Sequence, residues 1–123
     1  MSHVESTVGA FIEFDLATQI SKLRLEEAYQ HGRTSRTLVK HPDFRVVLTA
    51  LKAGVRIQQH KAAGRISVMT VAGHIRMHLP AKTVDLPLGR MIVLDREVPH
   101  DVEALEESAF LLTIAWPEGL ECS

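Results

Sequence analysis

The sequence predicts an all-β domain in which short antiparallel strands form a sandwich or barrel. Short runs rich in valine, isoleucine, leucine and threonine recur along most of the chain. Turn-forming residues separate these runs about every eight to twelve residues, which is typical of such architectures. The sequence contains no repeat, low-complexity segment or linker. We therefore expect a single domain over residues 1–123.

The N-terminal part of the chain, residues 1–36, is expected to form an arm and a short helix before the barrel begins. Apolar and charged side chains alternate over residues 10–16, which predicts a strand with one buried face. Apolar residues at helical spacing predict a helix over about residues 19–29. The polar segment 33–36 is predicted to be a connection.

Residues 37–117 are expected to form the barrel. The segment His41-Pro-Asp43 predicts a tight turn, because proline and aspartate favour turn geometry. This turn would join strands over residues 37–40 and 44–51 into a hairpin. Further strands are predicted at residues 55–60, 65–72, 74–79, 82–86, 90–94, 99–104 and 108–116.

Composition and charge exclude several classes of function. A net charge of −1 provides no positive field that would attract nucleic acid or anionic lipid. No apolar run approaches the roughly 20 residues that cross a bilayer, and residues 1–6 lack the pattern of a secretory signal. The single cysteine, Cys122, cannot form an internal disulfide. We therefore expect a cytoplasmic protein with no nucleic-acid or membrane partner.

A glycine-spaced segment in the middle of the chain carries the first of two histidines that mark a candidate site. Gly54 is followed after five residues by His60, and Gly73 ends the segment. Ala62 stands two residues after His60, and Ile66 lies on the next predicted strand. Imidazole is the commonest metal ligand and titrates nearest to neutral pH, so His60 is a candidate binding residue.

A second glycine-spaced segment carries the other histidine. Gly89 is followed by Asp95, Glu97 and His100. Together the two segments resemble the paired motifs of small single-domain cupins, the RmlC-like jelly-roll family, whose second motif has proline and glycine where Asp95 and Glu97 stand. The resemblance covers roughly two thirds of the chain. It implies a double-stranded β-helix, the cupin barrel, behind the N-terminal strand arm and helix.

The resemblance is incomplete at the metal-ligand positions. In metal-binding cupins three histidines and a glutamate hold one divalent ion, and Ala62 stands at the second histidine while Ile66 stands at the glutamate. Side chains two residues apart on a strand share a face about 6.6 Å apart, which lets a His-x-His pair converge on one ion. Ala62 supplies no such ring. The resemblance therefore implies at most a reduced site of His60 and His100, holding Zn, Ni, Fe or Mn.

The interior of the predicted barrel is the expected binding site, because the interiors of small barrels are concave and mostly apolar. With hydrocarbon side chains at two ligand positions, the pocket is expected to favour a small, largely apolar molecule. The expected lining residues are His60, His100, Gln58, Ala62, Ile66, Val68 and Met91.

Three hypotheses of function arise from this pocket. The first is a cupin of unassigned activity that binds a small molecule without a metal. The alternative is a divalent-metal-dependent enzyme, of the dioxygenase or isomerase type, that uses His60 and His100. The third is an interaction module in which the barrel is only a scaffold. Fold alone does not choose among them, because one architecture hosts many functions.

Other polar groups are expected outside the site. Alternation on the strand that follows Gly73 puts Ile75 on the buried face and both His74 and His78 on the opposite face. His100 and Asp101 are neighbours on one strand, so they point to opposite faces and are not expected to form a catalytic dyad.

The N-terminal arm is also expected to take part in assembly. Antiparallel sheets leave free edges that need covering, and residues 10–16 lie outside the resemblance. Cupins of this kind are commonly dimers, so the resemblance implies a homodimer in which the arm is involved.

Overall fold

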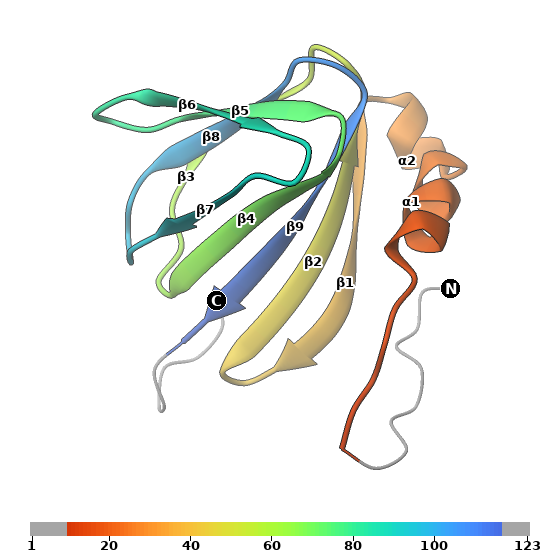
Figure 1. Cartoon of the computed structure of the whole chain (residues 1–123), viewed down its shortest axis with the longest axis horizontal. Helices are drawn as coiled ribbons and strands as arrows, with labels where there is room; N and C mark the ends of the chain where they lie inside the picture. The colour runs from red at the N-terminus through yellow and green to blue at the C-terminus, as the bar shows by residue number, and fades with distance from the viewer. Residues whose placement is uncertain (1–9, 117–123) are drawn as a thin grey trace.

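The computed structural model describes residues 10–116, and for His60 the backbone alone. This part of the chain folds into two facing antiparallel sheets with two short helices at one side (Figure 1). The helices are α1 (Leu16–Arg24) and α2 (Glu27–Gln30). The strands are β1 (Arg33–His41), β2 (Phe44–Leu51), β3 (Arg56–His60), β4 (Arg65–Ala72), β5 (His74–His78), β6 (Thr83–Pro87), β7 (Met91–Leu94), β8 (His100–Ala104) and β9 (Ser108–Ala115). The predicted all-β fold is confirmed.

The strands are shared between the sheets in an interleaved order. One sheet has the order β1-β2-β9-β4-β7, and the other has the order β3-β8-β5-β6. From β2 onward the chain passes to the opposite sheet at most of its connections. This is the jelly-roll arrangement, in which two sheets form the walls of one barrel.

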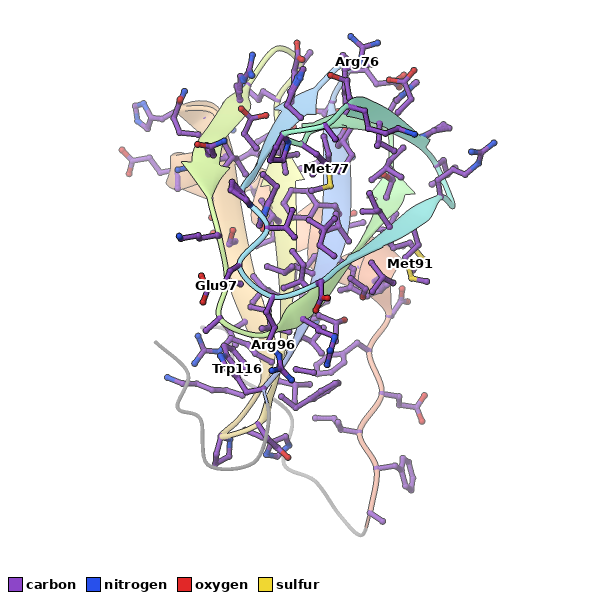
Figure 2. The ribbon with its side chains drawn as sticks, turned by 90° about the vertical axis from the view of Figure 1, so that its left-hand side faces the viewer. Arg76, Met77, Met91, Arg96, Glu97 and Trp116 are labelled. Atoms are coloured by element: carbon purple, nitrogen blue, oxygen red, sulfur yellow. The ribbon has the colours of Figure 1, made fainter. Side chains whose placement is uncertain are left out.

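The space between the sheets holds the main apolar core. Ile75 and Met77 of β5 are fully buried there, whereas the side chains of His74 and His78 keep about a third of their surface accessible on the outer face, as alternation predicts. Figure 2 shows Met77 between the sheets. The buried members of this core are Leu51, Ile66, Val68, Ile75, Met77, Leu86, Leu94, Val102, Ala104 and Phe110.

A second apolar cluster lies on the other face of the five-stranded sheet, beneath the helices. Ile20 and Leu23 of α1 and Tyr29 of α2 belong to one cluster with Leu48 and Ala50 of β2. The helices therefore cover a sheet face that solvent would otherwise reach. Neither described helix is long and apolar enough to cross a membrane.

Three details predicted for the N-terminal part are wrong. Residues 10–15 form no strand, and α1 begins at Leu16, earlier than expected. The segment 33–36 belongs to β1 instead of forming a connection. Alternation did identify Ile12 and Phe14 as the half-buried side chains of the arm. Alternation of apolar and polar residues indicates which side chains are buried. It does not show whether the segment pairs with a neighbouring strand, and residues 10–15 do not.

Gly73, which ends the first motif, joins β4 to β5 in a conformation and a space that suit glycine alone. Its φ is +75°, in the left-handed region that other residues seldom adopt. A Cβ at this position would lie 2.2 Å from the backbone oxygen of Glu107. This close approach lets Ser108 Oγ accept a hydrogen bond from the backbone nitrogen of His74 at 3.0 Å.

Tyr29 ties α2 to the connection between β8 and β9. Its hydroxyl donates a hydrogen bond to the Glu107 carboxylate, and Lys52 Nζ lies 5.4 Å from the centre of its ring. Burial, reinforced by the hydrogen bond to Glu107 and by its negative charge, raises the pKa of Tyr29 to about 12. The chain has one tyrosine, so its titration can be assigned directly.

We expect the stability of the fold to fall at high pH through Tyr29. Between pH 10, the ordinary pKa of tyrosine, and about 12, the unfolded chain releases the phenol proton while the folded chain keeps it. The stability that this group contributes is therefore complete below pH 10 and is lost as pH rises toward 12. Ultraviolet difference absorbance measures the ionisation, and denaturant unfolding at each pH measures the stability. Tyr29→Phe should abolish the absorbance change and flatten the decline, whereas ionisation near pH 10 in the folded protein would contradict the expectation.

Candidate functional site

A cavity of about 290 Å³ lies between the sheets. Most of its wall is apolar and comes from β2, β3, β4, β8 and β9: Val47, Ile57, Val68, Val102, Phe110 and Leu112. Its polar lining residues are Arg33, Ser35, Thr49 and His100. An apolar chamber with a few polar groups is the usual composition of a small-molecule site.

The polar groups of β1 and β2 lie at one side of this cavity. Ser35 and Thr49 are directly opposite each other in the β1–β2 ladder, and their hydroxyl oxygens are 2.8 Å apart. Each hydroxyl can donate one hydrogen bond and accept others, so the pair retains capacity to bind a ligand. Arg33 at the start of β1 is exposed, which places this side of the cavity next to solvent.

His100, the first residue of β8, is 4% exposed and lines the cavity. Its Nδ1 lies 3.0 Å from the carbonyl oxygen of Val98. A carbonyl oxygen only accepts, so Nδ1 donates to it.

The backbone of His60 lies opposite that of His100. The two residues are register partners in the β3–β8 ladder, after a register shift between Ile57 and His60. Such a bulge inserts an extra residue into one strand and changes the direction of the side chains beyond it. The two motif segments, forty residues apart in the sequence, therefore meet at their histidines.

A second cavity, of about 190 Å³, shares His100 and Leu112 with the first. Its remaining apolar lining residues are Ala62, Ala63, Ile66 and Ile114, and its remaining polar ones are Arg45, Lys61 and Trp116. The guanidinium carbon of Arg45 lies 5.7 Å from the centre of the Trp116 ring, a cation–π contact. Figure 2 shows Trp116 at the lower end of the barrel, where Arg96 also lies, with Arg76 at the upper end.

The two cavities are lined by several of the residues predicted from the sequence, namely His100, Ala62, Ile66 and Val68. Sequence reasoning missed Phe110 and Leu112, although the alternation along the last predicted strand could have identified them. It also missed Arg45 and Trp116, for which the sequence carries no local signal. These two residues meet only because β2 pairs with β9.

Met91 and Gln58 do not line either cavity, so these two assignments are corrected. Met91 is 57% exposed on the outside of β7, because Ile92 and Leu94 are the residues of that strand that turn inward. Figure 2 shows Met91 at the edge of the molecule, away from the interior. Gln58 is exposed on β3, within the register shift between Ile57 and His60.

The described side chains do not provide a metal ligand set. Within residues 10–116, leaving aside the side chain of His60, no three His, Cys, Asp or Glu side chains converge. Asp101, next to His100 in sequence, forms an ion pair at 2.9 Å with Arg56 and so does not orient the imidazole.

Comparison with known proteins finds no matching family model and no matching curated protein. Among solved structures, the chain is similar to a conserved protein of unknown function from Streptococcus pyogenes, with a TM-score of 0.75 and 27% identity over 97% of this chain and 98% of that chain. It is similar to a cupin 2 conserved barrel domain protein from Leptotrichia buccalis, with a TM-score of 0.65 and 26% identity over 68% of this chain and 41% of the other. An RmlC-like cupin protein from Desulfovibrio desulfuricans gives a TM-score of 0.65 and 20% identity over 92% and 97% of the two chains.

Proposed function

We propose that this protein, a cupin by fold, binds a small, largely apolar molecule inside its barrel, with His60 and His100 at the binding site. The observation that carries the proposal is the cavity of about 290 Å³ between the sheets. Its wall offers hydrocarbon contact over most of its area and a few groups that can fix the orientation of a ligand.

The expected affinity for a simple probe is set by buried area. Benzyl alcohol would bury about 200 Å² of apolar surface, which contributes roughly 5 kcal/mol at about 25 cal/mol per Å². The entropic cost of association reduces this gain. Small ligands bind with about −0.3 to −1.5 kcal/mol per non-hydrogen atom. About −0.5 kcal/mol for each of the eight such atoms of benzyl alcohol gives about −4 kcal/mol, a dissociation constant on the order of 1 mM.

Filling the cavity should abolish binding of this probe. Val68 is 1% exposed and lines the cavity, so Val68→Phe should occupy the space at a cost of about 1–3 kcal/mol in folding stability. Benzyl alcohol binding is measured by chemical-shift changes in two-dimensional NMR spectra, and thermal unfolding checks the fold. The matched control is Val93→Phe on β7, where the side chain is 62% exposed. Unchanged binding in the Val68 variant would place the probe elsewhere and remove the support for this site.

The alternative function, a divalent-metal-dependent enzyme of the dioxygenase or isomerase type, is supported by the register that sets His60 opposite His100. The hydrocarbon side chains of Ala62 and Ile66 count against it. We expect the protein, purified with Zn, Ni, Fe or Mn supplied, to hold much less than one metal ion per chain by elemental analysis. Stoichiometric metal that is lost in both His60→Ala and His100→Ala would establish the alternative instead.

We also propose that the protein forms a homodimer through its N-terminal arm. Phe11 of the arm is 69% exposed, and with Phe44 it lines an apolar groove between the arm and the β1–β2 hairpin. Light scattering should give twice the mass of one chain, and Phe11→Ser combined with Phe44→Ser should shift the protein toward the monomer. Leu25→Ser, at a leucine that is 84% exposed elsewhere, should leave the mass unchanged. A monomeric mass for the native protein would refute the dimer.

A further inference from the structure

We infer that the second cavity binds the carboxylate of a small organic acid, with Arg45 and Trp116 as its recognition residues. This inference rests on the proposed function, because it assigns the charged end of a molecule whose apolar part lies in the barrel. It starts from two buried nitrogen atoms that have no partner within the described part of the chain.

The first of these atoms is Nε1 of Trp116. The residue is 7% exposed, and its indole nitrogen is buried without a hydrogen-bond partner. The backbone nitrogen of Trp116 donates to the carbonyl oxygen of Asp43 at 3.0 Å, which anchors the residue beside the β1–β2 turn. Buried polar groups are nearly always hydrogen-bonded in folded proteins. An indole N–H only donates, so its missing partner is an acceptor.

The second atom is Nε of Arg45, which is also buried and without a partner. Arg24 Nε is also buried without a partner, but Arg24 Nη1 lies 3.9 Å from the carboxylate of Glu107. Four further arginines of the described chain each pair with a carboxylate. Those pairs are Arg36 with Glu26 at 2.7 Å, Arg56 with Asp101 at 2.9 Å, Arg65 with Asp95 at 3.1 Å and Arg76 with Asp85 at 2.8 Å. The described residues give Arg45 only the face of the Trp116 ring.

The other residues that line the second cavity indicate the charge and polarity of the ligand. Lys61 lines the same cavity, and its Nζ lies 4.0 Å from Glu97 Oε1 in an exposed ion pair. Glu97 has a φ of +62°, and its backbone nitrogen donates to the carbonyl oxygen of Ala62 at 2.9 Å. Apart from His100, the other lining residues are apolar, namely Ala62, Ala63, Ile66, Leu112 and Ile114. The cavity therefore combines two cationic side chains with a largely hydrocarbon wall.

A carboxylate meets these requirements. It only accepts hydrogen bonds when ionised, and its two oxygens can bind two donors at once. Hydrogen bonds to a charged acceptor are roughly twice as strong as neutral ones. One oxygen would accept from Arg45 and the other from Trp116, while the hydrocarbon part of the acid would lie against Ile66 and Leu112.

The test compares two probes of nearly the same shape, benzoate and benzamide, by calorimetric titration of the whole chain. Benzoate should bind about tenfold more tightly, because only benzoate brings a charged acceptor. Trp116→Phe keeps an aromatic ring but removes the N–H, and should weaken benzoate about tenfold while changing benzamide less than about threefold. Arg45→Met should abolish the preference for benzoate.

The matched control is Arg76→Met, which removes the same charge from the outer face of the barrel, where Arg76 pairs with Asp85. This variant should keep the native preference for benzoate. Equal binding of the two probes by the native protein, or a preference that survives in both cavity variants, would overturn the carboxylate site. In that case benzyl alcohol separates the two proposals. If benzyl alcohol still binds, only the carboxylate site fails, and if none of the three probes binds, the proposed function fails with it.

Discussion

The pairing of β9 on both of its sides is the constraint on which the rest of the structure depends. β9 is hydrogen-bonded to β2 along one edge and to β4 along the other, so it holds the centre of the five-stranded sheet. Its side chains alternate between Phe110 and Leu112, which face the barrel, and Ala109 and Leu111, which belong to the cluster under the helices. A slip of one residue would exchange these two faces. The register of β9 therefore determines both the wall of the cavity and the sheet surface on which the helices pack.

Local alternation explains why much of the fold could be predicted and why part of the site could not. The strand predicted over residues 65–72 is β4, because the buried Ile66 and Val68 alternate there with the polar Arg65 and Ser67. The segment 33–36 is polar and yet forms an edge strand, since an edge can be exposed on its outer face. Met91 was predicted to line the pocket, but residues 91–94 are all apolar, so alternation does not show which of them face inward. The meeting of Arg45 with Trp116 depends on pairing between distant strands, which a local pattern does not contain.

The charged side chains among the described residues that line the two cavities are all cationic. No aspartate or glutamate is among the described residues that line either cavity, whereas Arg33, Arg45, Lys61 and Trp116 bring donors that cannot accept a hydrogen bond. Ala62 and Ile66 stand where the cupin motif that the sequence resembles has metal ligands. The cationic residues Arg33 and Lys61 are exposed to solvent. Such a site selects ligands by the acceptors that they carry, and His100 lies where the two cavities meet.

The left-handed backbone of Glu97 has a consequence for how this protein can change over time. A residue other than glycine in this region costs on the order of 1 kcal/mol or more, and the resembling motif has glycine at this position. A single substitution could release that strain, but it would remove the acidic side chain beside Lys61. Glycine at position 97 would therefore raise the stability of the fold, but it would leave Lys61 without its carboxylate partner. Positions of this kind are where natural proteins give up stability for function.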